Sequence, residues 1–115
     1  LIDTGSLPTE AKELKTFTAE IEKLKPTHRL AVFSATTRSS DIQTFGSALK
    51  PLEASHLGFT MTDLTDCWGG MLAATEATGL KIALTAQSPS GSGSLDQPNT
   101  STVVSKLLGR EVADE

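Results

Sequence analysis

The sequence predicts an α/β domain in which helices cover both faces of a short parallel sheet, in three layers. Apolar runs of strand length alternate with segments whose apolar residues recur at helical spacing. The 115 residues fit one small domain with a core of its own, but not two such domains. Strands that alternate with helices form βαβ units, whose crossover connections are right-handed.

The amino-terminal part is expected to hold a strand end followed by a helix. Residues 1–3 (LID) match the last residues of a strand whose beginning is missing. Helical spacing of apolar residues over 8–25 predicts a helix, with Ser6 as its N-cap and Pro8 in its first turn. Pro26 is expected to stop this helix, because proline cannot continue the hydrogen-bonding pattern.

The next βα unit is predicted from a continuous apolar run over 28–35. A run of this kind is typical of a strand that is covered on both faces. Ser40 and Gln43 have the spacing of a capping box at the start of the following helix. That helix is expected to face the core with four apolar residues: Ile42, Phe45, Leu49 and Leu52.

The second half is expected to add two strands, two helices and a long loop. In chain order these are a strand over 57–60, a helix over 71–78 closed by Gly79, a strand over 80–86, a Ser/Gly/Pro-rich loop over 87–98, and a helix that begins at Asn99 or Thr100 and ends at Gly109. Residues 110–115 are expected to be a frayed acidic tail, so the domain itself spans 1–109.

Composition and charge exclude several classes of protein. The 14 acidic and 10 basic residues give a net charge of -4, and the scattered cations form no stripe that could follow a nucleic-acid backbone. Cys67 is the single cysteine, which excludes an internal disulfide and a cysteine zinc site. No run of 18 apolar residues and no charged-then-apolar leader occurs. We therefore expect a cytoplasmic protein without a transmembrane segment or direct contact with nucleic acid.

The first residue is Leu1 and not methionine, so we expect a processed product or an excised piece of a longer chain.

The polar residues that follow the apolar strand over 57–60 predict a ligand pocket. In open α/β sheets, ligands bind outside the carboxyl ends of the strands. The carboxylate of Asp63 is expected either to bind a ligand there or to cap a helix, and the sequence does not favour one role over the other. Asp66 and Cys67 lie nearby, but without a histidine beside it we expect the thiol to be packed and inert.

For the other candidate residues, structural roles are expected and not catalysis. His28 and His56 each precede a strand, where capping or surface positions are expected rather than catalysis. Trp68 is expected to pack the short helix against its neighbours. The GSGS segment at 91–94 lies inside a long loop and not between a strand and a helix, so it is expected to be a surface connection. We expect no catalytic residue and no metal site.

Four short motifs, in order and at matching spacing, carry a resemblance to a known family. They are Asp3-Thr4-Gly5-Ser6-Leu7, Ser34-Ala35-Thr36-Thr37, Thr60-Met61-Thr62-Asp63 and Leu107-Leu108-Gly109. In this order they resemble DTAGR, SATT, TKLD and LLG of the carboxyl-terminal half of the signal recognition particle (SRP) GTPase domain. The chain is most similar to the flagellar-biosynthesis branch of that family. The resemblance implies a truncated P-loop NTPase-like fold.

The resemblance also implies a vestigial nucleotide site. Its residues would be Asp3, Thr4, Gly5, Thr60, Met61 and Asp63. In the family, the aspartate of TKLD accepts hydrogen bonds from guanine and the lysine packs along the base, but here Met61 replaces that lysine. The aspartate of DTAGR orients a water on magnesium, and the arginine lies at a partner interface, where this chain has Leu7.

The G-x-x-x-x-G-K-[ST] loop, which cradles the phosphates of such enzymes and holds magnesium, is missing from the 115 residues. We therefore expect a degenerate, non-hydrolysing module that acts through protein contacts, in protein targeting or flagellar placement. Members of the family pair face to face, which implies a homodimer or another protein partner, and a peripheral membrane location through partners.

Two alternatives stay open. The first is that the chain is the carboxyl-terminal piece of a working GTPase, which would use GTP and magnesium only with an upstream P-loop. Whether the protein is an enzyme depends on that upstream sequence. The second is an unrelated doubly wound domain such as a receiver, which Asp3 at a strand end suggests. The expected late strand has Lys81 near its start and no lysine at its end, which disfavours a receiver.

Overall fold

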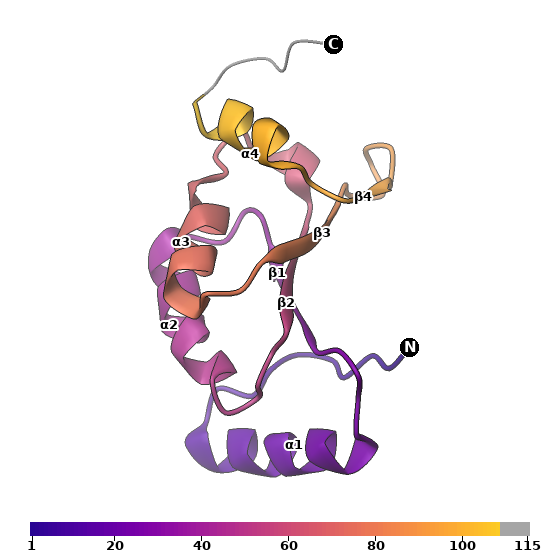
Figure 1. Ribbon diagram of the computed structural model, residues 1–115, viewed down its shortest axis with the longest axis vertical. Coiled ribbons are helices and arrows are strands. Elements are labelled where there is room, and N and C mark those ends of the chain that lie inside the picture. The colour runs from indigo at the N-terminus through magenta and orange to yellow at the C-terminus, as the bar shows by residue number, and fades with distance from the viewer. Residues whose placement is uncertain (109–115) are drawn as a thin grey trace.

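The computed structural model describes residues 1–108 and shows a four-stranded sheet with helices on one face and beyond the two ends of its strands (Figure 1). In chain order the elements are α1 (Ala11–Leu24), β1 (Leu30–Ser34), α2 (Ser39–Leu49), β2 (His56–Thr60), the short 3-10 helix η1 (Thr62–Leu64), α3 (Gly69–Thr78), β3 (Ile82–Ala86), β4 (Leu95–Asp96) and α4 (Thr100–Leu107). The strands lie in the order β1-β2-β3-β4, with the first three parallel and β4 antiparallel to β3. The predicted α/β class is confirmed, and the sheet is mixed.

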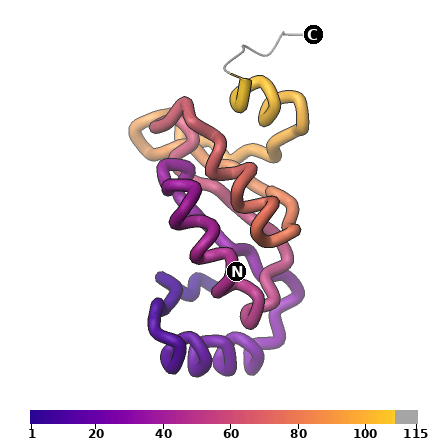
Figure 2. The backbone as a smooth tube through the Cα atoms, turned by 90° about the vertical axis from the view of Figure 1, so that its left-hand side faces the viewer, coloured from indigo at the N-terminus to yellow at the C-terminus, as the bar shows by residue number. Residues whose placement is uncertain are grey.

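Helices α2 and α3 lie together on one face of the sheet, as both views show (Figures 1 and 2). Helix α1 crosses beyond the ends where the strands begin, and α4 lies beyond the ends where they finish (Figure 1). The core is formed between the sheet and the α2–α3 pair by eight buried residues: Ile42, Leu49, Leu52, Leu57, Phe59, Trp68, Met71 and Ala74.

The centre of this core is the face of β2 that carries Leu57 and Phe59. Their side chains are 0% and 1% exposed. The parallel register sets Phe33 of β1 beside Phe59, and the two rings stack with their centroids 6.0 Å apart. Ile42, Leu49 and Leu52 were predicted to face the core and are buried. Phe45 was predicted to do the same, but it is 37% exposed. Helical and strand periodicities therefore predicted this core well.

The opposite face of the sheet is apolar and open at β1. Because side chains alternate along a strand, Leu30 and Val32 point away from the core that contains Ala31 and Phe33. They remain 42% and 57% exposed. The expectation that β1 would be covered on both faces is thus not met among residues 1–108.

The amino-terminal predictions are wrong at two points. Residues 1–3 form no strand, and Leu1 and Ile2 are exposed. Helix α1 begins at Ala11 after Glu10, so Ser6 is not its cap. The side chain of Leu7 instead packs against the core.

The predicted capping box of α2 is also wrong. The helix begins at Ser39 after Arg38, two residues earlier than a cap at Ser40 would give. Ser40 therefore lies inside the first turn, where its carbonyl accepts a hydrogen bond of 3.1 Å from Thr44 Oγ1. No side-chain hydrogen bond caps the start of α2.

Three other helix ends are confirmed. Helix α1 stops before Pro26, with Lys25 in the left-handed region at φ 47°. Gly79 closes α3 at φ 70°, and its N–H donates to Thr75 O at 2.8 Å. Asn99 caps α4, where its Oδ1 accepts from Thr102 N at 2.8 Å. The expected helix end at Gly109 and the acidic tail over 110–115 lie outside the described residues.

Strand β4 was not predicted, because it is two residues long and lies within the Ser/Gly-rich segment taken as a loop. In the part of the chain that the structure describes, every helix is too short or too polar to cross a membrane.

Candidate functional site at the carboxyl ends of the strands

The ends of β1, β2 and β3 meet at one edge of the sheet because these strands are parallel. Their loops are joined there by hydrogen bonds. Ala35 N donates to Thr60 O at 2.8 Å, and Thr62 Oγ1 donates to Ala86 O at 3.3 Å. This edge therefore brings together segments that are about 25 residues apart, as a ligand site in such a sheet requires.

Asp63 is the most strongly bonded polar side chain at this edge. It lies in η1, and both of its carboxylate oxygens accept hydrogen bonds from Ser88. The Ser88 N–H donates to Oδ1 at 2.6 Å, and the Ser88 hydroxyl donates to Oδ2 at 2.7 Å. Ser88 itself is only 5% exposed. The carboxylate thus joins the turn after β2 to the turn after β3.

These bonds change the protonation of Asp63. The Ser88 hydroxyl and then the Ser88 N–H lower the pKa of this carboxyl below its ordinary value of 3.8, because both donors favour the charged form. A lowered pKa means that Asp63 stabilises the folded state above its ordinary pKa. This contribution is lost as the pH falls through the lower folded value.

The turn over 87–94 is built closely around the carboxylate. A Cβ on Gly91 would lie 2.6 Å from Asp63 Oδ2, so any other residue there would displace the carboxylate from its present position. The hydroxyls of Ser88 and Ser90 are 2.9 Å apart. Gln87 Oε1 accepts from the N–H and the hydroxyl of Ser92, at 3.1 and 2.7 Å. Sequence reasoning missed Ser88 and Gly91, since their Ser/Gly-rich surroundings indicate only a turn.

Met61 and Thr60 lie at the same edge. Met61 has a left-handed backbone at φ 56° and is 41% exposed, and its sulfur accepts a contact of 3.7 Å from Ser34 Oγ. Thr60 Oγ1 makes a long hydrogen bond of 3.5 Å to Phe33 O. The structure therefore brings together the beginnings of two of the sequence motifs, at Ser34 and Met61.

Asp3, Thr4 and Gly5 do not join this group. All three are exposed, and Asp3 Oδ1 accepts from Gly5 N at 3.0 Å in a local turn. The amino terminus lies level with the half of the sheet where the strands begin, in both views (Figures 1 and 2). Of the six predicted site residues, the structure thus places Thr60, Met61 and Asp63 together and the other three elsewhere.

Cys67 and Trp68 point in opposite directions at the start of α3. Cys67 is exposed, so the expectation of a packed thiol is wrong. Its N–H donates to Thr65 Oγ1 at 3.0 Å, in a turn that directs the next side chain inward. Trp68 is 7% exposed, with Lys106 Nζ 5.8 Å from its ring centroid, which confirms its predicted packing role.

The two histidines lie at the other end of the sheet. The rings of His28 and His56 meet edge to face with centroids 6.0 Å apart. His56 is the first residue of β2, so both rings are away from the edge that carries Asp63. Within residues 1–108, no three side chains of His, Cys, Asp or Glu gather as metal ligands would.

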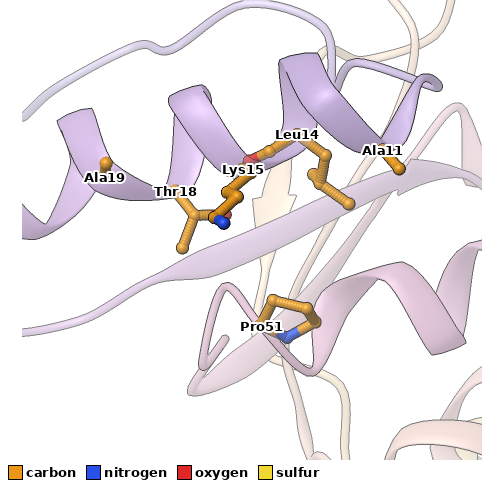
Figure 3. Close-up of a pocket in the computed structure, with 6 residues that line it drawn as sticks. All are labelled: Ala11, Leu14, Lys15, Thr18, Ala19 and Pro51. Atoms are coloured by element: carbon orange, nitrogen blue, oxygen red, sulfur yellow. The ribbon is translucent and has the colours of Figure 1, made fainter.

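A groove of about 440 Å³ lies between α1 and the chain after α2 (Figure 3). Its lining is mostly apolar and consists of Ala11, Leu14, Lys15, Thr18, Ala19 and Pro51. The groove borders α1, which crosses the ends where the strands begin (Figure 1). It is therefore separate from the site that contains Asp63.

The comparison with known proteins supports the fold. No protein-family model and no curated protein sequence matches the chain. Among solved structures, the chain is similar to the crystal structure of FtsY from Mycoplasma mycoides, with a TM-score of 0.62 and 22% identity over 85% of this chain. The chain spans 32% of the length of that FtsY chain. This likeness confirms that the chain has the α/β fold of the matching part of FtsY.

Proposed function

We propose that this chain is a degenerate, non-hydrolysing SRP GTPase-like module that acts through protein contacts. The 115 residues contain no G-x-x-x-x-G-K-[ST] loop, on which phosphate transfer depends, so this chain by itself is not expected to hydrolyse GTP. Met61 supports this expectation further, since a thioether cannot supply the charge of a lysine. Protein targeting and flagellar placement are the contexts proposed, in the cytoplasm or at the membrane through partners.

The proposed role in protein contacts rests on strand β1, which has one unpaired edge and an exposed apolar face. Among the described strands, β1 pairs with β2 alone, so one of its edges has free backbone groups. Its sequence, LAVFS, contains no charge, and Leu30 and Val32 are exposed beside that edge. Monomeric proteins usually protect such edges with charges or prolines, so an unprotected one indicates a pairing surface.

The partner proposed for this surface is a second copy of the chain. Two β1 strands related by a two-fold axis can pair antiparallel and extend the sheet across both copies. The pairing brings no like charges together, although the chain as a whole has a net charge of -4. It also places Leu30 and Val32 of one copy beside those of the other, on the same face of the extended sheet.

Val32→Glu is expected to abolish this association. A glutamate on each copy would place two like charges at the shared edge, and it would remove the apolar contact of a side chain that is 57% exposed. Sedimentation analysis should give a two-chain mass for the unmodified protein at about 100 μM and a one-chain mass for the variant, a loss of at least about tenfold in affinity, or about 1.4 kcal/mol.

Leu72→Glu is the matched control for this experiment. Leu72 is 47% exposed on α3, away from β1, so its replacement should leave the two-chain mass unchanged. A strict monomer at about 1 mM for the unmodified protein, equivalent to an association weaker than about 4 kcal/mol, would contradict the dimer.

Guanine nucleotides are expected to bind no more tightly than about 1 mM, or roughly 4 kcal/mol. The reason is that the chain lacks the loop that cradles phosphates, and that Asp63 is already bonded to Ser88. Calorimetric titration with GTP and GDP in magnesium measures this directly. Micromolar, guanine-specific binding that disappears in Asp63→Ala would disprove the proposal that the module is degenerate.

A second candidate is a piece of a working GTPase. It is favoured by the share of FtsY that the chain spans, 32%, and by the free edge of β1, where a further strand of the same domain could pair. The chain would then use GTP and magnesium together with residues outside it. The sequence upstream of Leu1 in the intact gene product decides between the two: an intact P-loop favours the enzyme, and a missing or scrambled one favours the contact module.

A further inference from the structure

Helix α1 shares less buried surface with the rest of the domain than α2 and α3 do. None of its 14 residues is buried, whereas α2 and α3 each contribute buried residues to the core. Its side chains that pack against the core are Leu14 and Phe17, both only partly buried and both in the first half of the helix. Because few buried apolar contacts hold α1, its opening requires less free energy than opening of the sheet.

The groove of about 440 Å³ lies under the same part of α1. Leu14 and Thr18 are directed toward the side on which Pro51 lies, with the groove between them (Figure 3). A packed interface would fill this space with side-chain atoms, and without them the apolar side chains that line the groove lose dispersion contacts. The groove therefore weakens the attachment of α1 further.

The second half of α1 is held by one ion pair, between Glu22 and Arg29. Glu22 Oε1 accepts from Arg29 Nη1 at 2.9 Å, and the same Nη1 donates to Leu52 O at 2.8 Å. The backbone of Arg29 is bonded to Ser55, whose Oγ accepts from Arg29 N at 2.9 Å and donates to Arg29 O at 3.1 Å. Arg29 is thus fixed to the body of the domain, and Glu22 is the partner that belongs to α1. Within residues 1–108 this is the only ion pair.

The chain on both sides of α1 allows a change of direction. Leu7 packs against the core, and residues 8–10 between it and the helix form no helix or strand. After the helix, Lys25 has a left-handed backbone at φ 47°, and Pro26 cannot continue the helical hydrogen bonds. Rotations in these two short linkers move α1 without breaking a hydrogen bond of the sheet.

We propose that α1 detaches from the domain as a unit while the sheet and the α2–α3 pair stay folded, with the ion pair between Glu22 and Arg29 as its latch. Detachment exposes Leu14 and Phe17 and removes one wall of the groove. The inference goes beyond the proposed function and does not depend on it, because α1 is part neither of the edge of β1 nor of the site that contains Asp63.

The first test is native-state hydrogen exchange in increasing urea, followed by nuclear magnetic resonance. The amides over 15–24 should share one opening free energy. Relative to their intrinsic rates, they should exchange at least about 100-fold faster than the amides of β2. Exchange of the 15–24 amides at the opening free energy of β2, or opening free energies that differ from one α1 amide to the next, would overturn the proposal.

The second test removes the latch with Glu22→Gln, which keeps the size of the side chain and loses its charge. Exchange over 15–24 should become at least about threefold faster, as expected for a partly exposed ion pair, while the β2 amides exchange as before. Glu20→Gln is the matched control, because Glu20 is exposed on the same helix and makes no ion pair within residues 1–108. Equal rates over 15–24 in the two variants would overturn the role of Glu22 as the latch.

Discussion

Replacing Phe59 with alanine is expected to lower the free energy of unfolding by about 3–5 kcal/mol. Phe59 is 1% exposed on the central strand, and its ring stacks on Phe33 with the centroids 6.0 Å apart. Removing the ring leaves a cavity between the sheet and the α2–α3 pair, which neighbouring side chains fill only in part. The loss is a large share of the roughly 5–15 kcal/mol that typically stabilises a domain.

Urea unfolding followed by circular dichroism measures this loss, with Phe45→Ala as its control. Phe45 is also an aromatic neighbour of Phe33, with a centroid distance of 6.4 Å, but it is 37% exposed. Because water already reaches that ring, its removal should lower the unfolding free energy by only about 1 kcal/mol. Equal losses for the two variants would show that the core is not centred on β2.

Replacing Gly70 with alanine is the second change expected to have a large effect. A Cβ there would lie 3.1 Å from both Ile42 Cδ1 and the Thr37 carbonyl oxygen. The start of α3 would have to move away from α2, and overpacking of this kind lowers the unfolding free energy by about 1–3 kcal/mol. The gain in helix propensity, at most about 1 kcal/mol, is too small to reverse the sign.

Gly69→Ala is the matched control one residue earlier in the same helix. Its Cβ would meet no atom within 4 Å, and its backbone has no left-handed φ. The same urea measurement should therefore show a change between zero and a gain of about 1 kcal/mol. A gain of equal size at Gly70 would mean that α2 and α3 do not approach as closely as described.

Much of the fold follows from local patterns in the sequence. Apolar runs predicted β1, β2 and β3 to within a few residues, and Gly79 and Asn99 predicted helix ends that depend on single residues. The failures occur where distant packing decides, as at residues 1–10, where Leu7 turns toward the core and no helix forms. Strand β4 could not be predicted, because its two residues are too few to show the alternation of apolar and polar side chains that indicates a strand.

The candidate site was also predicted only where local sequence decides the position of a residue. Asp63 and Met61 could be predicted because they follow a strand directly, at the edge where parallel strands end. Ser88 could not, since it lies 25 residues further along in a turn whose serines all look alike in sequence. Only the packing of η1 against that turn selects Ser88 among them, and only the same packing requires glycine at position 91.

The uncharged edge of β1 also bears on the behaviour of the chain when no partner is present. An apolar edge strand with free backbone groups is a template to which strands of other chains can add. In the proposed dimer the two β1 edges pair with each other, whereas a monomer leaves its edge open. A change that weakens the dimer without adding a charge to β1 should therefore promote aggregation, and the same five residues govern both outcomes.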